Sequence, residues 1–305
     1  MKTHTDRASI LQSTRRTEEP ILFVINPISG GGRALRTEKI IRKWGRETGR
    51  DILIPRSDFP GHATQITSDF IKSGGITAIA VGGDGTVHEV GKALIGTHAK
   101  LGIIPVGSGN GLARHLRIPM STQRALQRIE DPHVQEIDTG WVNDHPFLML
   151  AGWGFDAAIA REFTRSKGRG LSAYAKMVLR SMGSFSAPEV KVKEGVKWLY
   201  EGPGFFINVV NSSQFGNEFK IAASADTSDG QLDLAFLPPP PIWKFPLIAT
   251  RMLLGQPLSQ DYQSQRIKDI TIHCEGDGLN IDGEWVPMKG PYRVKVNPAS
   301  IRVLI

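Results

Sequence analysis

Hydrophobic residues in the first half of the chain gather in short runs that alternate with amphipathic stretches. Short apolar runs predict strands, and apolar residues that recur every three to four positions predict helices. Strands that alternate with helices in this way predict a parallel sheet with helices on both faces. The predicted strands are 21–26, 51–54, 77–81 and 101–106, and the predicted helices are 33–46, 62–72 and 87–95.

The pattern changes after about residue 131, where many short apolar runs are separated by turn residues. Few helices are predicted there, which is typical of a mainly antiparallel sandwich. The predicted strands are 134–141, 146–150, 190–192, 205–210, 232–237, 270–273, 279–281, 292–296 and 301–305, and the predicted helices are about 156–181 and 242–254.

The predicted fold class is therefore α/β plus β, with an N-terminal parallel-sheet α/β domain and a C-terminal, mainly antiparallel β-sandwich domain. Residues 1–19 are polar and lack periodicity, so we expect a mobile tail there. The α/β domain is expected at 20–131 and the sandwich at 132–305. One alternative is that the last strand returns to the first domain. A cleft between two domains is a preferred ligand site.

Charge narrows the possible partners, since the net charge is +7 and the pI is near 9.5. Nucleic acid, an anionic membrane surface or an anionic small substrate would each suit such a chain, and a basic surface without a role is the plain alternative. The basic residues do not form one block, and nothing matches a nucleic-acid-binding motif. No nucleic-acid partner is therefore expected.

Cys274 is the single cysteine, so an internal disulfide framework is excluded and a reducing compartment is expected. The first 19 residues lack the apolar core of a signal peptide. No apolar run approaches the roughly 18 residues that span a bilayer. These features predict a cytoplasmic protein.

The loop Gly82-Gly83-Asp84-Gly85-Thr86 carries the most specific chemistry, because it joins a predicted strand to a predicted helix. Glycine allows a ligand to approach the backbone closely, and the N–H groups at a helix start bind phosphate. Asp84 would repel a bare phosphate unless a cation lay between them. The alternative is a tight turn in which Asp84 caps the helix, but glycines around one acid favour phosphoryl transfer.

Two further glycine loops follow predicted strands. The first runs from Asn26 to Arg33, and the other contains Ser108 and Asn110 in the sequence 105–114. Both could bind phosphate or ribose, and both could equally be ordinary turns or helix caps. The loop from Asn26 to Arg33 has neither the Lys-Ser or Lys-Thr of a Walker A loop nor the spacing of a dinucleotide-binding fingerprint. The occurrence of three such loops at one sheet edge favours a shared ligand.

Acidic residues beside glycine recur later, at 226–233 and at 279–285. β-turns are the stronger interpretation of both segments from the residues alone. Asp229 with nearby carbonyl groups could instead hold a hard cation such as Mg²⁺. Glu284 could act as a general base if the fold brings it to the glycine loops.

These motifs, in this order, resemble the diacylglycerol kinase catalytic-domain family, which includes bacterial lipid kinases and the sphingosine and ceramide kinases. NAD kinases are distant relatives. The resemblance covers roughly residues 20 to 305. It implies an NAD-kinase-like first domain and an ATP- and Mg²⁺-dependent enzyme that phosphorylates a lipid hydroxyl. Diacylglycerol and a sphingoid-type lipid are the two acceptors considered.

The resemblance also implies roles for individual residues. Glu284 would be the catalytic base, and Asp84 would organise the phosphates through Mg²⁺. Asp138 would help to link the metal site to the substrate. ATP would contact Asn26, Ser57, Gly82, Gly83, Asp84, Gly85, Thr86, Val87, His88, Ser108 and Asn110. Mg²⁺ would bind at Asp226, Asp229 and Gln231.

One position departs from the bacterial pattern, since Gly111 stands where an aspartate is usual. His88-Glu89 and the segment 151–155 are more similar to the sphingosine kinases. The leading hypothesis is a lipid kinase that associates peripherally with an anionic membrane surface. The alternatives are a kinase for a soluble substrate such as NAD, and a nucleotide-binding regulator without catalysis. A homodimer is left open.

Overall fold

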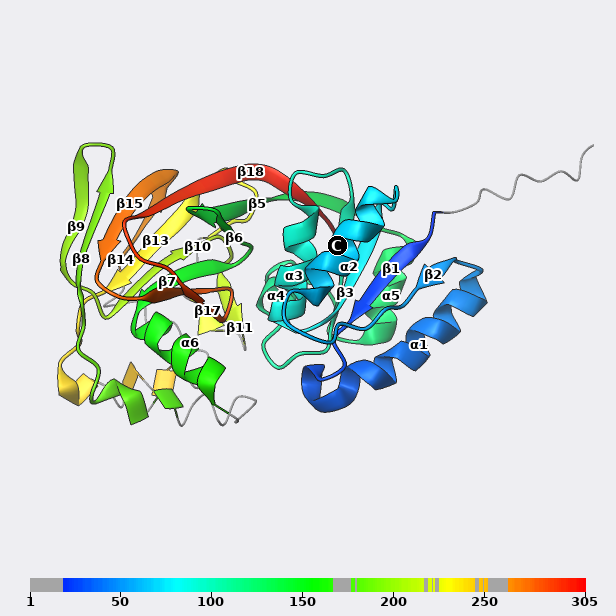
Figure 1. The fold of residues 1–305 in the computed structure, drawn as a ribbon, viewed down its shortest axis with the longest axis horizontal. Coiled ribbons are helices and arrows are strands. Elements are labelled where there is room, and N and C mark those ends of the chain that lie inside the picture. Colours follow the sequence, from blue (N-terminus) through cyan, green and yellow to red (C-terminus); the bar gives the residue numbers. More distant parts are fainter. Residues whose placement is uncertain are drawn as a thin grey trace, which may run out of the picture.

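The computed structural model describes residues 19–166, 177–178, 180–216, 219–220, 222, 225–244, 247–248, 250–251 and 263–305. Two lobes lie side by side, one of strands and helices and the other mainly of strands (Figure 1). This arrangement confirms the predicted fold class of an α/β part followed by a β-sandwich.

The α/β lobe is built on four parallel strands in the order β2-β1-β3-β4. Alternate residues of β1 point to opposite faces of this sheet, as the two-residue period of a strand requires. Leu22 and Val24 pack under α2 and α3, whereas Phe23 and Ile25 pack against α1 and α5. The strands are β1 Ile21–Ile25, β2 Ile52–Leu53, β3 Thr77–Gly82 and β4 Lys100–Pro105. The helices are η1 Ser29–Gly32, α1 Arg33–Thr48, α2 His62–Lys72, α3 Asp84–Leu94, α4 Gly111–His115 and α5 Thr122–Glu130.

The second lobe is a sandwich of two sheets around one core. One sheet has the order β14-β13-β10-β7-β16-β17 and is antiparallel. The other continues from β4 through β18, β15, β8 and β9, with β5 and β6 at its side. Buried residues of both sheets, among them Trp153 and Tyr292, fill the space between them. The strands are β5 Val134–Val142, β6 His145–Phe147, β7 Leu150–Gly154, β8 Glu189–Glu194, β9 Lys197–Pro203, β10 Phe206–Val210, β11 Gln214–Gly216, β12 Phe219–Lys220, β13 Leu232–Leu237, β14 Gln263–Ile267, β15 Asp269–Cys274, β16 Gly278–Ile281, β17 Glu284–Pro287 and β18 Tyr292–Leu304.

β18 is one strand of 13 residues, although the sequence pattern predicted two separate strands there. It pairs with β5 along both halves, and the register shifts between Asn297 and Ile301. Near its end it also pairs in parallel with β4. Pro298 lies in the shift, where a missing N–H costs no ladder bond. β18 therefore connects the sandwich directly to the parallel sheet.

Other element predictions were wrong at polar edges and around the segment 146–150. That segment is not one strand, since β6 ends at Phe147 and β7 begins at Leu150. The strands β9, β14 and β17 were missed because their residues are largely polar or half-exposed. The predicted helix 156–181 begins as α6, Phe155–Arg165, and residues 167–176 lie outside the described residues. Within the predicted helix 242–254, the 3₁₀ turn η2 spans Ile242–Lys244, and 252–254 lie outside the described residues.

Candidate active site

Three glycine loops meet at the carboxyl edge of the parallel sheet, because β1, β3 and β4 are neighbours that run the same way. Their backbones are in close contact. A Cβ at Gly107 would overlap the Cα of Gly83, and one at Gly30 would overlap the carbonyl oxygen of Val106. Any larger residue would push the loops apart, so these glycines allow the three loops to form one compact edge.

Numbered along the chain, the three glycine loops are 26–33 after β1, 82–86 after β3 and 105–114 after β4. Asp84 links the second loop to the third. Its Oδ2 accepts a hydrogen bond from the Asn110 N–H at 2.8 Å, and its Oδ1 accepts one from the Gly111 N–H at 2.6 Å. Asp84 thus caps α4 rather than its own helix α3, which the sequence could not indicate. Arg33 makes a second link, since it donates to the carbonyl oxygens of Gly30 and Gly107 at 3.0 and 3.3 Å.

The charge of Asp84 is held in an unfavourable place. Burial raises the pKa of its carboxyl, the N–H groups of Gly111 and Asn110 lower it, and the nearby Asp282 raises it again. The net shift is upward. A carboxylate in this position gains from a neighbouring cation, which agrees with the hypothesis that a metal lies between Asp84 and a phosphate.

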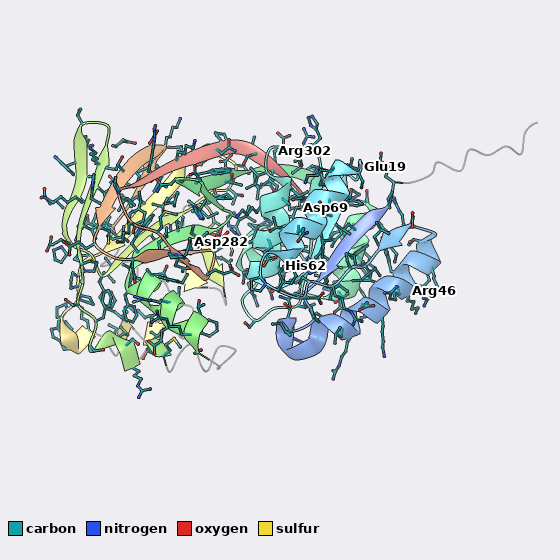
Figure 2. The ribbon with its side chains drawn as sticks, in the orientation of Figure 1. Glu19, Arg46, His62, Asp69, Asp282 and Arg302 are labelled. Atoms are coloured by element: carbon teal, nitrogen blue, oxygen red, sulfur yellow. The ribbon has the colours of Figure 1, made fainter. Side chains whose placement is uncertain are left out.

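The hairpin between β16 and β17 brings the distal acids to the same place. Asp282 and Gly283 form its two-residue turn with φ angles of 49° and 94°, both in the left-handed region. Asp-Gly is the sequence preferred for a hairpin turn of this kind. The turn interpretation of this segment was therefore correct, and the turn is also part of the site. Figure 2 labels Asp282 where the sandwich faces the α/β lobe.

Asp282 joins three parts of the chain through one buried carboxylate that is 3% exposed. Its oxygens accept hydrogen bonds from the N–H groups of Leu148, Met149 and Leu150 at 2.7 to 2.9 Å. Nδ1 of His88, on α3, donates to Oδ2 at 2.7 Å. This contact spans 194 residues and connects the two lobes at the site.

His88 carries a positive charge more readily because of this contact. Burial opposes ionisation of the ring, but the hydrogen bond and the charge of Asp282, with a smaller contribution from Glu284, raise the pKa of His88. An imidazolium beside the glycine loops would favour an anionic ligand there. Sequence reasoning missed Asp282, because its Asp-Gly pair already has a sufficient explanation as a turn.

Glu284 begins β17, directly after this turn, and reaches the second glycine loop. Its Oε1 lies 3.2 Å from the position that a Cβ on Gly85 would take. Burial among the surrounding groups raises the pKa of the Glu284 carboxyl, His88 lowers it, and Glu89 and Asp282 raise it. The residue as a whole is still exposed, so its carboxyl is partly shielded from water by its neighbours and yet open to a ligand. The fold thus meets the condition under which Glu284 could act as a general base.

The other predicted nucleotide contacts fall into two groups. Ser108 is exposed at the tip of the third loop, and Ser57 is held beside β1 by a bond from its N–H to the Ile25 carbonyl at 2.9 Å. Asn26 follows β1 directly, and its Oδ1 accepts a hydrogen bond from the Ile28 N–H at 3.2 Å. These three residues lie at the loop edge, where a ligand could reach them.

Three other residues predicted to contact the nucleotide pack in the core or form hydrogen bonds within the loops. Val87 packs its side chain into the core, and its N–H donates to the Gly83 carbonyl at 3.0 Å. Asn110 uses both ends of its amide on Gly107. Thr86 is 4% exposed and packs against Gly82. The Val87 side chain is buried in the core, so a contact between this residue and a nucleotide stays a prediction that concerns its backbone.

The turn predicted to bind Mg²⁺ is tied to the buried Asp138. Oδ2 of Asp138 accepts from the Gly230 N–H at 2.7 Å, and Oδ1 accepts from the Ala299 N–H at 2.8 Å. Asp229 accepts from the Gln231 N–H at 3.0 Å and lies 3.8 Å from the Arg266 guanidinium.

The residues of this turn test the fit of a metal. Asp226 and Gln231 offer carbonyl oxygens and Asp229 a carboxylate, which are donors that suit a hard cation. Arg266 competes for the same carboxylate. Within the described ranges no group of three or more His, Cys, Asp or Glu side chains could hold a metal. Mg²⁺ at this turn stays a prediction.

Replacement of Asp229 with asparagine tests that prediction. If Mg²⁺ binds at the turn, added Mg²⁺ should raise the melting temperature of the wild type, and the variant should lose this response because the carboxylate charge is gone. Differential scanning fluorimetry with MgCl₂ and with EDTA measures both. Asp144→Asn, at an exposed position, is the matched control. An equal Mg²⁺ response in all three proteins would leave the turn with a structural role only.

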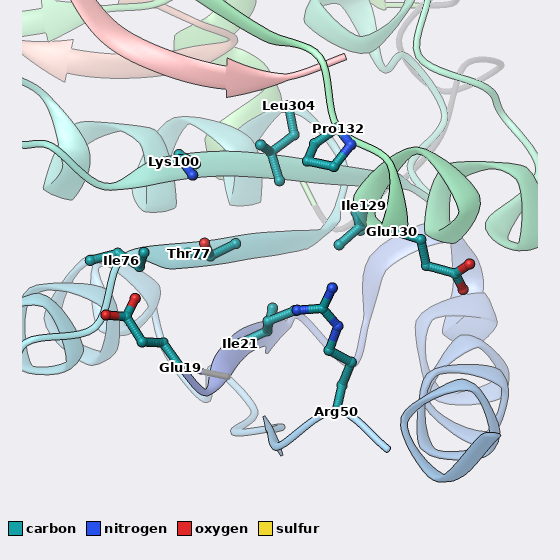
Figure 3. Close-up of a pocket in the computed structure, with 10 residues that line it drawn as sticks. All are labelled: Glu19, Ile21, Arg50, Ile76, Thr77, Lys100, Ile129, Glu130, Pro132 and Leu304. Carbon is teal, nitrogen blue, oxygen red and sulfur yellow. The ribbon is translucent and has the colours of Figure 1, made fainter. Parts of the chain in front are cut away.

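A hollow of about 500 Å³ lies at the opposite edge of the parallel sheet. Figure 3 shows Ile21, Thr77 and Lys100, which begin three of its strands, among the lining residues. Open α/β sheets bind ligands at the carboxyl edge. The hollow is therefore separate from the glycine loops and has no part in their chemistry.

Comparison with known proteins decides the family. A family model described as "Diacylglycerol kinase catalytic domain" matches residues 20–142, and one described as "YegS C-terminal NAD kinase beta sandwich-like domain" matches residues 150–305. The chain belongs to the diacylglycerol kinase catalytic-domain family. The resemblance of the ordered motifs is confirmed, and the protein is a kinase.

Relatives of this kinase cover most of its length. The chain is 28% identical over 299 residues to a Pseudomonas aeruginosa protein named "Probable lipid kinase YegS-like", with 94% of each chain covered. It is 30% identical over 216 residues to "Diacylglycerol kinase" of Bacillus subtilis, with 68% of this chain and 70% of that protein covered.

Solved structures confirm the fold of the kinase. A diacylglycerol kinase from Bacillus anthracis superposes with a TM-score of 0.71 at 22% identity, over 94% of this chain and 96% of that one. An NAD kinase from Archaeoglobus fulgidus in complex with ATP superposes with a TM-score of 0.53 at 12% identity, over 94% and 93% of the two chains. The predicted NAD-kinase-like architecture is thereby confirmed.

Proposed function

We propose that this kinase transfers the γ-phosphate of ATP to the hydroxyl group of a lipid, with Mg²⁺ as cofactor. The observation that supports the proposal is the approach of Glu284 to Gly85, because it brings a candidate base from the sandwich lobe to a candidate phosphate-binding loop. Phosphoryl transfer requires bound phosphates, charge neutralisation and a group that accepts the hydroxyl proton. The names of the relatives support a lipid acceptor.

The residues divide the chemistry between them. The glycine loops and the start of α3 would hold the phosphates through backbone N–H groups, and Ser57 and Ser108 would contact the nucleotide. Glu284 would take the proton of the lipid hydroxyl. The hydroxyl oxygen would form a bond to the γ-phosphorus while the bond between the γ-phosphorus and the β-phosphate oxygen breaks, and ADP would leave. Mg²⁺ would neutralise charge between the phosphates and Asp84.

A kinase for a soluble substrate such as NAD is the alternative, and the fold shared with NAD kinases is what favours it. Labelled ATP and Mg²⁺ with diacylglycerol, monoacylglycerol, sphingosine, ceramide and NAD distinguish the two. A labelled lipid product is expected. A labelled dinucleotide would contradict the lipid assignment, and the absence of every product would favour a nucleotide-binding regulator.

The proposed setting is the cytoplasm, with peripheral attachment to an anionic membrane, and a homodimer is possible. In the described part of the chain no helix has the length and hydrophobicity to cross a membrane. The net charge of +7 suits attraction to anionic lipids.

Asp84→Asn should reduce turnover by at least about 100-fold, because the amide cannot accept both N–H groups of the third loop or attract a cation. The melting temperature should fall only slightly, because the amide leaves one of the two N–H groups without its acceptor but also removes a charge that burial disfavours. Steady-state kinetics and thermal melts measure the two effects. Asp51→Asn, at an exposed position, is the control. Full activity of Asp84→Asn would exclude a role for its charge.

A further inference from the structure

The excess of basic over acidic residues in the chain is seven, and two segments, 165–188 and 234–260, carry a charge of that size. Together they contain seven basic residues and no acidic residue, whereas the whole chain has 37 basic and 30 acidic residues. The remainder is therefore balanced, with 30 of each. The seven are Arg165, Lys167, Arg169, Lys176, Arg180, Lys244 and Arg251.

The fold brings the described parts of these two segments together on the sandwich lobe. Val178 and Met182 of the first segment and Ile248 of the second are buried in one hydrophobic cluster with Phe155 and Phe205. Figure 1 shows the described parts of both segments, in green and yellow, at the same end of this lobe. The described residues of these two stretches, which include the basic residues Arg180, Lys244 and Arg251, thus lie on one side of the lobe.

Large apolar side chains are exposed on this surface. Trp243 is 71% exposed and Leu247 is 50% exposed, although Ile248 beside them is buried. Nζ of Lys244 lies 5.6 Å from the centroid of the Trp243 ring. Tryptophan and lysine at the edge of an apolar surface are typical of a membrane interface, where the ring and the aliphatic stem enter and the charge stays in water.

This surface is connected to the hairpin that carries Glu284. Oγ of Ser181 donates to Glu162 of α6 at 2.7 Å. The neighbouring Arg161 lies over the ring of Trp285 at 5.2 Å and pairs with Asp277 at 2.8 Å. Trp285 follows Glu284 directly, so α6 lies between the basic surface and the candidate base.

We propose that this surface, formed by Arg180, Trp243, Lys244, Leu247 and Arg251, docks the kinase on an anionic lipid membrane. The proposal rests on the proposed function in one respect: a kinase that phosphorylates a lipid must reach the membrane in which that lipid is located. Each basic residue near an anionic surface strengthens binding by about five-fold. Insertion of Trp243 and Leu247 adds a contribution that does not depend on charge.

Vesicle binding by the full chain tests the surface without any catalytic step. Phosphatidylcholine vesicles with and without phosphatidylglycerol are sedimented with the protein in the absence of ATP. The wild type should bind the anionic vesicles strongly and the neutral ones weakly. Trp243→Ser with Leu247→Ser, and separately Arg180→Gln with Arg251→Gln, should each lower the partition coefficient by about ten-fold or more.

Matched control variants test whether the loss of any exposed tryptophan or arginine, and not only of those on this surface, weakens vesicle binding. Trp198→Ser removes a tryptophan that is 53% exposed on β9, at another part of the same lobe. Arg36→Gln with Arg46→Gln removes two exposed charges from α1. Both controls should stay within about two-fold of the wild type. Added salt should weaken the wild type more than the arginine variant.

Several results would overturn the proposal: no binding of the wild type to anionic vesicles, an equal loss in the control variants, or a dimer in sedimentation that the Trp243 variant abolishes. Kinase turnover of detergent-dispersed lipid is measured on the same proteins, with melts as a check on folding. Retained turnover with lost vesicle binding supports the docking surface. Vesicle binding without any lipid product would reject the proposed function alone.

Discussion

Glu284→Gln should lower kcat by about 100- to 10,000-fold, because general-base catalysis contributes about that much. The amide keeps the size of the side chain and its position beside Gly85 but cannot take a proton from the acceptor hydroxyl. Binding of ATP should stay within about two-fold, since the glycine loops are unchanged. Single-turnover kinetics and calorimetric titration of ATP separate the two effects.

The pH profile gives a second measure of the same residue. Burial raises the pKa of the Glu284 carboxyl, although the charge of His88 opposes the shift. Only the ionised form is a base, so kcat of the wild type should rise with pH through this raised value and then level off. The variant should lose this rise of kcat with pH. Glu275→Gln, on the exposed turn before β16, should retain both the rate and this rise. An unchanged kcat in Glu284→Gln would exclude Glu284 as the general base.

Asp282→Ala should lower the free energy of unfolding by about 3–5 kcal/mol, the usual cost of removing one partner of a buried ion pair. The change leaves the N–H groups of Leu148, Met149 and Leu150 without their acceptor and deprives His88 of its charge partner. The hairpin would also lose its fixed position at α3, so kcat should fall together with stability. Urea denaturation and steady-state kinetics measure the two losses.

Asp282→Asn tests the ionic part of this contact with a smaller disturbance. A raised His88 pKa means that the folded state binds the proton more tightly than the unfolded chain. The stabilisation is complete below about pH 6.5, which is the ordinary pKa of histidine, and is lost as the pH rises through the raised pKa of His88. The stability difference between wild type and variant should therefore be larger in mildly acidic than in mildly alkaline buffer.

Asp144→Asn is the control, because this exposed aspartate should show no such pH dependence. A pH-independent difference for Asp282→Asn would mean that the charge of His88 does not contribute. Loss of stability without loss of kcat would mean that the contact holds the lobes together but does not position Glu284.

Much of the fold could be predicted from sequence periodicity. The runs that became β1, β3 and β4 have nearly continuous hydrophobic residues, as strands buried on both faces require. The edge strands β9 and β14 could not be found in this way, because one face of an edge strand is solvated and its residues resemble those of a loop. The bulge in β18 was also hidden, since Pro298 normally ends a strand.

The candidate site was predicted in its composition but not in its connections. Asp84 was expected near a cation, and the structure shows in addition that it caps α4 through Asn110 and Gly111. The metal turn at Asp229 and the nucleotide contacts at Ser57 and Ser108 stay predictions. Asp282 was read as a turn residue, because short-range chemistry explains an Asp-Gly pair fully.

The sequence by itself determined the glycine loops, the alternation of strands and helices in the first domain and the residue types that can bind phosphate or accept a proton, because these depend on local propensity and spacing. Only the tertiary structure decided that Glu284 meets Gly85, that Asp282 holds His88 across 194 residues, and that the described parts of two basic segments lie on one side of the sandwich lobe. Such contacts depend on how sheets pack and pair over long separations. No local pattern records that arrangement.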